Sequence, residues 1–418
     1  MLIKYRFNGF ILYVRMYKKQ HKVWRHLMTI HIEEAKRRFW IIVAIVSISG
    51  FSQGMLLPLI SVIFEQAGIS STINGLHATG LYIGVLLVSP FLEQPLRKFG
   101  YKPIILVGGA IVFSCLLLFP LWQNVWFWFA LRLLIGVGDQ ALHISTQTWI
   151  TSSSARSNLG KSMAIYGLSF SVGFAVGPLM VNLLSVSQAF PFILSSVLCL
   201  IAWSLVFFVQ NEKPERLRGN PGEEGLKRYT ATIVIAWVAF LGPFVYGFLE
   251  SSLNALFPVY AMRNGFTPSL VPIMLSIFTL GGIVTQIPLG MLGDKIGRRK
   301  ILLMGFFVSG FVFLLASFVE QSEWLVMLCF FLAGTVVSSV FSQGISYMAD
   351  LTPKHLLPTG NLLCGIAFSI GSLIGPIIGG MFIEHVAHIS FLLFIAAVLF
   401  FMWAILYFFG KTPKKADA

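Results

Sequence analysis

The sequence predicts an all-α membrane protein with twelve transmembrane helices arranged in two pseudo-symmetric six-helix bundles. Three observations predict this class. The 418 residues are 56% hydrophobic and only 11% charged, whereas about a quarter of the residues of an ordinary soluble protein carry a charge. Apolar runs recur along most of the chain, and one long polar stretch divides them six and six. A large soluble domain is therefore excluded.

Each apolar run is close to the length that a membrane-spanning helix needs, which is about 20 residues. The runs are too long for barrel strands and lack in-out alternation, and a helix satisfies its own backbone groups in lipid. We therefore predict helices. The predicted spans are 39–64, 73–92, 103–121, 125–149, 161–184, 190–209, 230–260, 270–292, 301–319, 324–348, 360–382 and 390–409.

The polar stretch 210–229 separates the two sets of six spans. It combines proline, glycine and nine charged residues, which is typical of a linker between domains. We therefore predict five parts of the chain. They are a basic N-terminal segment (1–38), a first six-helix bundle (39–209), the linker (210–229), a second six-helix bundle (230–409) and a tail (410–418).

The lysine and arginine residues are concentrated in every second loop. With an inside N-terminus, 28 of the 30 basic residues fall in inside segments, Arg263 alone falls outside, and Arg132 lies within a span. This asymmetry predicts a multi-pass protein of the cell membrane with both termini and the linker in the cytoplasm. The net charge of +14 is thereby accounted for by topology, and we expect no nucleic-acid partner.

The sequence carries no pattern of an enzyme or a metal site. No nucleophile with a base, no metal-ligand cluster and no Gly-Lys phosphate loop occurs. The four cysteines lie singly in apolar stretches. We expect no catalytic residues, no metal, no cofactor and no direct use of ATP.

The two halves resemble each other in three places. Pro58 corresponds to Pro258, the loop 99–108 to 296–305, and GFAVGP (173–178) to GSLIGP (371–376), at offsets of 200, 197 and 198 residues. Three pairs in one order at nearly one spacing indicate an internal duplication of six helices.

These landmarks make the chain resemble a major facilitator superfamily transporter of the bacterial drug/proton antiporter type. The loop GMLGDKIGRRK (290–300) is similar to the superfamily signature Gly-x-x-x-Asp-x-x-Gly-Arg-Arg/Lys. The resemblance implies a cytoplasmic latch formed by Asp294 and Arg298, an acid at a helix end and its basic partner. The first-half copy (93–103) departs from the signature, with Glu93 in place of glycine and Arg97 in place of the acid. We expect no such latch there.

The second signature is Gly-x-x-x-Gly-Pro, which occurs once in each half. Its residues are Gly173, Gly177 and Pro178, and Gly371, Gly375 and Pro376. Glycine allows helices to approach closely and proline bends them, so helix packing explains both copies as well as a role in coupling does. In the superfamily, this pattern on the fifth span is called an antiporter motif, which favours export.

A polar stripe lies on the fourth span. Arg132, Asp139 and His143 fall within about 40° of one another on a helix, and Arg132 with Gly136 and Gly138 resembles the family element Arg-x-x-x-Gly-x-Gly. A charge in the bilayer core costs about 2.5–3.5 kcal/mol, so these side chains are predicted to face a wet cavity. Asp139 is the expected partner of Arg132, although two helical turns separate them.

Glu250 on the seventh span is the other intramembrane acid, and Gln53 is its counterpart on the first span. A carboxyl group in a low-dielectric site can take up and release a proton near neutral pH, as a proton carrier must. The alternative is an acid near the outer interface, hydrogen-bonded to Ser251 or Asn254. Gln343 on the tenth span belongs to another polar face, which either packs helices or lines the cavity.

The N-terminal stretch 1–27 is long for a segment that precedes a first span. It is either a basic, aromatic anchor for the anionic inner leaflet or the product of a start codon assigned too early, with Met28 as the first residue.

Together these features predict a secondary active transporter that rocks between two states, with protons as the coupling ion and a small molecule as substrate. We expect export of a small hydrophobic or cationic compound by a monomer in the lipid bilayer. Proton-coupled uptake of a polar metabolite is the alternative, and a membrane sensor that does not transport is the third possibility.

Overall fold

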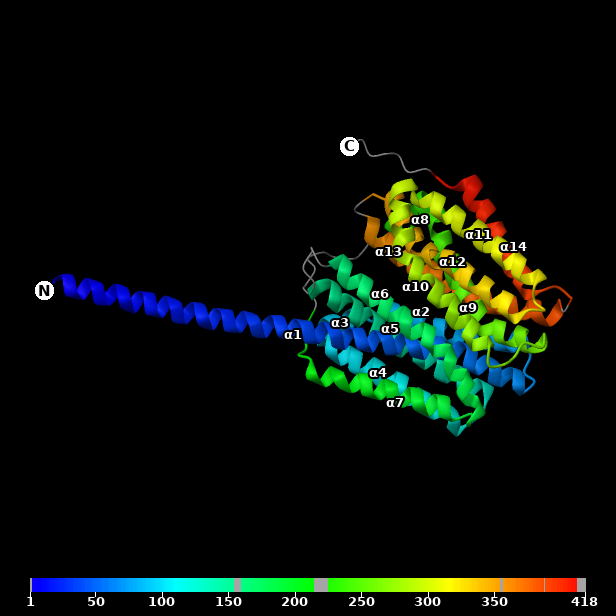
Figure 1. Ribbon diagram of the computed structural model, residues 1–418, viewed down its shortest axis with the longest axis horizontal. Coiled ribbons are helices and arrows are strands. Elements are labelled where there is room, and N and C mark those ends of the chain that lie inside the picture. The colour runs from blue at the N-terminus through cyan, green and yellow to red at the C-terminus, as the bar shows by residue number, and fades with distance from the viewer. Residues whose placement is uncertain (1, 154–158, 214–224, 354–355, 387, 412–418) are drawn as a thin grey trace.

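The computed structural model of the chain describes residues 2–153, 159–213, 225–353, 356–386 and 388–411, and within these ranges it is helical without β-strands (Figure 1). In the first half the helices are α1 (Leu2–Gln66), α2 (Ser71–Val88), α3 (Glu93–Phe99), α4 (Tyr101–Leu118), α5 (Val125–Ser153), α6 (Leu159–Val176) and α7 (Phe190–Ser204). In the second half they are α8 (Gly225–Ala236), α9 (Leu241–Arg263), α10 (Val271–Ile296), α11 (Arg298–Phe318), α12 (Glu323–Leu351), α13 (Leu357–His385) and α14 (Phe391–Phe409).

Twelve stretches of the described chain are long and apolar enough to cross a membrane. They match the twelve predicted spans in order, which confirms the predicted fold class. Two stretches differ in detail. Helix α1 continues back to Leu2 without a break at the predicted start of the first span. The seventh span is interrupted by a 3₁₀ turn at Trp237–Phe240, because the backbone of Ala236 leaves the α-helical region.

The two halves have separate hydrophobic cores. One core runs from Ile42 to Val209, and the other is built almost entirely from residues beyond Ala236. Helix α8 already begins at Gly225, inside the predicted linker, and residues 214–224 lie outside the described ranges. The exact boundaries of the five predicted parts remain a prediction.

The halves pack against each other at the end where α1 connects to α2, which we call the α1–α2 end. There the Arg263 guanidinium makes two hydrogen bonds to the Glu65 carboxylate, at 2.7 and 2.9 Å. The Thr72 amide donates to Glu384 at 2.9 Å, and the Asn74 amide donates to the Ala255 carbonyl at 3.1 Å. Each of these bonds joins one half to the other.

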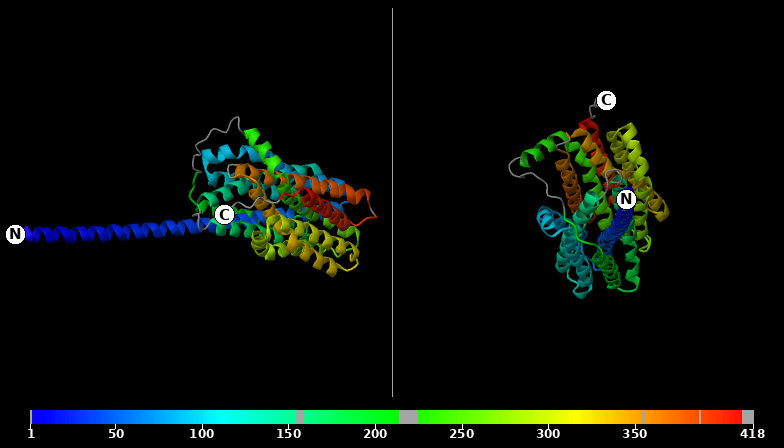
Figure 2. Two further views of the ribbon diagram at one scale, coloured as in Figure 1. Left: turned by 90° about the horizontal axis from the view of Figure 1, so that it is seen from above. Right: turned by 90° about the vertical axis from the view of Figure 1, so that its left-hand side faces the viewer.

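The opposite end carries the described start of the linker, and we call it the linker end. Helix α1 leaves the bundle at this end (Figures 1 and 2). The last described residue, Lys411, donates here to the carbonyls of Val234 and Ile235 near the interruption of the seventh span. The linker start, α8 and the end of α14 therefore share one end of the bundle.

Candidate functional site

The predicted polar stripe lies on α5, and it points into the protein. Arg132 and Asp139 are completely buried, and His143 is half-buried. The stripe is therefore kept away from lipid, as the cost of a charge in hydrocarbon requires.

Arg132 is held by α2 and α1. Its Nη1 donates to Nδ1 of His77 at 2.9 Å, and its Nη2 donates to the Leu56 carbonyl at 3.0 Å. Nε2 of His77 lies 3.1 Å from the carbonyl of Val125. A guanidinium can only donate and a carbonyl can only accept. His77 is therefore the neutral tautomer with its proton on Nε2.

The expected pairing of Arg132 with Asp139 does not occur. The hydrogen bonds of Arg132 go to His77 and Leu56, and Asp139 is bonded to Ser49 instead. The physical reason is the two helical turns between them, about 10 Å along the axis. A residue on a neighbouring helix meets the guanidinium at shorter range.

Asp139 faces α1. The Ser49 hydroxyl donates to its Oδ1 at 2.9 Å. Its Oδ2 is buried and has no hydrogen-bond partner in the described part of the chain. A buried carboxyl oxygen without a donor is costly for an ionised acid. Only one of the two carboxyl oxygens of Asp139 therefore has a hydrogen-bond donor in the described part of the chain.

His143 lies at the centre of a polar chain in the first half. The Gln53 amide nitrogen is 3.5 Å from its Nε2, and the Tyr166 hydroxyl is 2.9 Å from its Nδ1. The Tyr166 hydroxyl is in turn 3.3 Å from the hydroxyl of Thr146. The structure therefore brings Gln53 and His143 together.

Glu250 lies on α9 in the second half and is half-buried. Within the described residues, its carboxylate makes no hydrogen bond and no ion pair. The two neighbours proposed to satisfy it are bonded elsewhere. Ser251 donates to the Gly247 carbonyl at 2.8 Å, and Asn254 donates to the backbone carbonyl of Glu250 at 2.8 Å.

Tyr246 precedes Glu250 by one turn of α9, and its ring belongs to a cluster of four aromatic rings. We call this cluster the aromatic box. Tyr246 is 5.8 Å from Phe341 and 6.1 Å from Phe368, measured between ring centroids. Phe368 is 5.5 Å from Phe341 and 6.5 Å from Tyr82 of α2. The box therefore contains one ring from the first half and three from the second.

Gln343 is buried on α12 and donates to the Leu289 carbonyl of α10 at 3.1 Å. The hydroxyls of Ser339 and Ser342 bond to carbonyls of their own helix. These contacts support the packing alternative for this polar face, because they lie within the second half.

The predicted latch pair lies at the linker end. Arg298 donates to Asp294 at 3.0 Å and to the Ser346 carbonyl at 3.1 Å, and it also pairs with Asp350 at the end of α12. The sequence did not predict a role for Asp350. Asp350 lies 52 residues beyond Arg298, so their positions along the chain do not indicate that they pair. The weak signal available was that Asp350 is an acid at the end of a predicted span.

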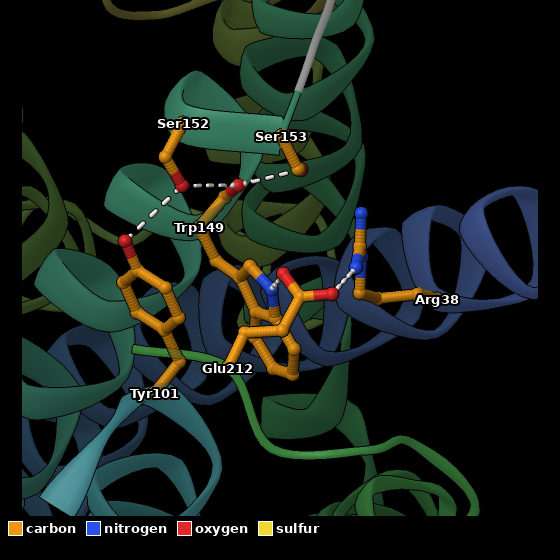
Figure 3. Close-up of polar contacts among 6 residues, drawn as sticks. All are labelled: Arg38, Tyr101, Trp149, Ser152, Ser153 and Glu212. Atoms are coloured by element: carbon orange, nitrogen blue, oxygen red, sulfur yellow. Dashed lines mark hydrogen bonds and ion pairs between the residues drawn. The ribbon is translucent and has the colours of Figure 1, made fainter. Parts of the chain in front are cut away.

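In the first half, the degenerate loop is bonded to the start of the linker. The Glu212 carboxylate accepts from Trp149 Nε1 at 2.8 Å and pairs with Arg38, as Figure 3 shows. Its backbone carbonyl accepts from the Tyr101 amide at 2.9 Å, and the Tyr101 ring stacks on Trp149. Glu212 thus supplies a carboxylate close to the loop in which Arg97 replaces the signature acid.

The motif glycines form close helix contacts in both halves. A Cβ on Gly173 would lie 1.8 Å from the Ser47 carbonyl oxygen, and one on Gly177 would lie 2.5 Å from the Met55 nitrogen. In the second half, a Cβ on Gly371 would lie 2.0 Å from the Phe244 carbonyl oxygen, and Gly375 is similarly close to Phe248. Each motif therefore packs its helix against the helix that carries Gln53 or Glu250.

The two prolines of these motifs act differently. At Gly177 the α-helix gives way to a 3₁₀ helix, Gly177–Ser185, with Pro178 in its first turn. Pro376 lies inside α13, which continues to His385. In the first half, the α-helix therefore changes to a 3₁₀ helix where the bend was predicted. In the second half, α13 continues as an α-helix through Pro376.

No group of three or more metal-binding side chains occurs in the described ranges. Three residues of the site were not predicted from the sequence, namely His77, Tyr166 and Ser49. The first two lie within predicted spans. They could have been found by the rule that pointed to Asp139, namely that a polar side chain inside the membrane marks a functional site. Ser49 carries no such signal, because serines are common in membrane helices.

Comparison with known proteins agrees with this architecture. The family model of the Major Facilitator Superfamily matches residues 42–243 and 239–418. The chain is 52% identical over 378 residues to an uncharacterized MFS-type transporter, YfkF, of Bacillus subtilis strain 168, covering 90% of this chain and 96% of that protein. It is 22% identical over 363 residues to the uncharacterized MFS-type transporter YcaD of Salmonella arizonae, covering 86% and 93%.

Two solved structures share the fold. The nucleoside transporter NupG superposes with a TM-score of 0.73 at 13% identity, covering 90% of this chain and all of that chain. A bacterial homologue of the human lysosomal transporter Spinster, in an inward-facing and occupied conformation, gives a TM-score of 0.70 at 13% identity, covering 91% and 98%. The family match over both halves, the high identity to YfkF and the twelve apolar helices together place this chain in the Major Facilitator Superfamily, as a multi-pass membrane transporter.

Proposed function

We propose that this transporter works by alternating access and couples proton entry to the export of a small hydrophobic or cationic compound. The observation that carries this proposal is the placement of Asp139 and Glu250. They lie within membrane spans, one in each half, and neither is paired with a basic side chain in the described residues.

Unpaired acids inside a membrane are costly, and they are retained at ion and substrate pathways. Arg132 is the basic residue closest along the chain to Asp139 within its span, but its bonds go to His77 and Leu56. Asp139 and Glu250 are therefore available to exchange protons, which is what coupling requires. The polar chain from Gln53 through His143 to Tyr166 supplies further groups that can pass a proton.

The packing of the two halves supports alternating access. Hydrogen bonds between the halves gather at the α1–α2 end, and the motif glycines let α6 and α13 pack tightly within their own halves. Two rigid bundles joined by polar contacts at one end can rock about a central site. The predicted orientation places the α1–α2 end outside, so the described conformation corresponds to a state closed to the outside.

The test is transport in proteoliposomes containing the purified full chain, with a proton gradient imposed in each direction. We expect the gradient to drive one or more members of a radiolabelled panel of hydrophobic cations, neutral drugs and polar metabolites against the proton flow. Asp139→Asn and Glu250→Gln should abolish the coupled movement without lowering membrane abundance. Glu33→Gln, at an exposed acid, is the matched control.

The direction of solute movement separates the alternatives. Solute moving together with protons would replace export by uptake. If no solute moves under any gradient, the proposed proton-coupled export is wrong. The alternative of a membrane sensor that does not transport is then favoured. Full coupling in both acid variants would remove the assignment of Asp139 and Glu250.

A further inference from the structure

We propose that Glu384, at the end of α13, is a latch that holds the α1–α2 end closed by capping the start of α2 in the other half. This inference rests on the alternating access of the proposed function. It gives one carboxylate at the surface a direct influence on the balance between the two states.

The start of α2 needs partners for its backbone amides. The first four N–H groups of an α-helix have no partner within the helix, and with the helix dipole they give its start a partial positive charge. The Ser70 hydroxyl accepts from the Ile73 amide at 3.3 Å, and the first turn of α2 contains no acidic residue. Glu384 accepts from the Thr72 amide at 2.9 Å. A carboxylate of the second half therefore caps a helix of the first half.

One face of α13 brings Glu384 to this position. Pro376, Gly380 and Glu384 follow one another at intervals of four residues, so they lie on the same side of the helix. A Cβ on Gly380 would lie 2.4 Å from the Ser71 carbonyl oxygen, and a Cβ on Gly75 would lie 2.0 Å from the Pro376 carbonyl oxygen. The backbones of α2 and α13 therefore touch along this face, and the contact ends at Glu384.

The bond between Glu384 and Thr72 can form and break in each cycle. It joins the two halves, so opening the α1–α2 end breaks it. Glu384 is exposed and Thr72 is half-buried, so water reaches both groups once the helices separate. Neither group is then left buried without a partner, which is the costly outcome for a polar group. The bond therefore stabilises the closed state without a large penalty in the open one.

The predicted latch at the linker end is engaged differently in this conformation. Asp294 accepts from Arg298 at 3.0 Å, and Arg298 also pairs with Asp350. All three residues belong to the second half, whereas Glu384 joins the second half to the first. Two latches at opposite ends, with the one at the closed end engaged between the halves, are what alternating access requires.

The duplicated position in the other pair of helices lacks these groups. At the offset of 198 residues between the two Gly-x-x-x-Gly-Pro motifs, Glu384 corresponds to Val186, which has no carboxylate. Thr72 corresponds to Leu270, just before α10. The first turn of α10 contains Pro272, which has no N–H to donate. The latch therefore belongs to α2 and α13 and does not follow from the fold alone.

The test measures the opening of the α1–α2 end by double electron–electron resonance on the purified full chain in nanodiscs. The spin labels are attached at Gln66→Cys and Gln321→Cys, both exposed, after the four native cysteines have been replaced by alanine. Glu384→Gln should raise the ratio of open to closed populations at least twofold. Glu384→Lys should raise it further, because the start of α2 repels a positive charge.

Glu323 provides the matched control. Its carboxylate also lies at this end and accepts from a backbone amide, that of Thr267, but both residues belong to the second half. Glu323→Gln should therefore leave the ratio unchanged. Salt provides a second check, because the Debye length falls to about 3 Å at 1 M. High salt should reduce the difference between Glu384→Gln and the native chain.

A second pair of labels separates a latch from local fraying of α2. Gln94→Cys and Lys300→Cys are exposed positions at the linker end, one in each half. In Glu384→Gln this distance should shorten as the distance at the α1–α2 end lengthens. Lengthening at the α1–α2 end alone would show that α2 frays without rocking, and it would overturn the latch.

The other outcomes are equally decisive. An unchanged ratio in both Glu384 variants, or an equal rise in Glu323→Gln, would also overturn the latch. The measurement needs neither solute nor gradient. A shifted ratio without gradient-driven export would therefore leave the latch standing while the proposed export fails, and proton-coupled export with an unchanged ratio would refute the latch alone. Variants enter the comparison only if they elute as a single species in gel filtration.

Discussion

Arg132 shows how a buried charge can be retained without a carboxylate. The guanidinium donates to a neutral imidazole and to a backbone carbonyl, and the imidazole of His77 is fixed in turn by the Val125 carbonyl. Phe64 and Phe129 pack edge-on against the same ring. This arrangement ties α5 to α2 and α1, and it leaves Asp139 unpaired.

His77→Leu is therefore expected to destabilise the protein. It removes an acceptor from a buried guanidinium, and hydrogen bonds to charged groups are worth about 1.5–3 kcal/mol. Thermal unfolding of purified protein in detergent should show a clear fall in the midpoint. His388→Gln, at an exposed position, should not change the midpoint. An unchanged midpoint in His77→Leu would mean that Arg132 finds another acceptor.

At the scale of the helix, the Gly-x-x-x-Gly-Pro motifs act first as packing surfaces. Gly173 lies against α1, and Gly50 and Gly54 of α1 lie against the Phe170 and Phe174 carbonyls of α6. The same relation joins α13 to α9 through Gly371 and Gly375. Small residues on both partners let the backbones approach closely, which is how membrane helices associate.

Gly173→Leu should accordingly reduce the yield of folded protein sharply. Its Cβ would overlap the Ser47 carbonyl, and overpacking that forces side chains and backbone to shift costs about 1–3 kcal/mol. Gly167→Leu is the matched control on the same helix, because a Cβ there meets no atom within 4 Å. Fluorescence-detected gel filtration measures the yield of both. Equal yields would show that α6 moves away from α1 without cost.

At the scale of the whole molecule, the balance between the two states depends on contacts that cross the halves. The Arg263 and Glu65 side chains are 38% and 16% exposed. Pairs of this kind contribute about 0–1 kcal/mol, which is enough to shift a two-state equilibrium by up to about fivefold. Arg263, the one basic residue predicted to lie outside, thus has a structural role.

Arg263→Glu should populate the state that is open at the α1–α2 end, because it replaces attraction by repulsion. Spin labels at Gln66→Cys and His388→Cys, both exposed, should report a longer distance in double electron–electron resonance. The exchanged pair Glu65→Arg with Arg263→Glu should restore the original distance distribution. Failure of the exchange to restore it would show that the ion pair does not hold this end closed.

Several features of the fold could be predicted because they depend on the composition and spacing of residues within one segment of the chain. Hydropathy gave the twelve spans, and helix periodicity placed Arg132, Asp139 and His143 on one face of α5. The duplicated motifs indicated two related bundles. The same arguments failed for Arg132, whose partner was expected on its own helix and lies on α2.

The sequence by itself determined that this chain spans a membrane with twelve helices in two halves, because burial in lipid depends on the composition of each segment. Only the tertiary structure decided which side chains meet. His77 reaches Arg132, Tyr166 reaches His143, Asp350 reaches Arg298 and Tyr82 reaches Phe368. Each pair joins different helices, and the distance between residues on different helices is set by packing rather than by their separation along the chain.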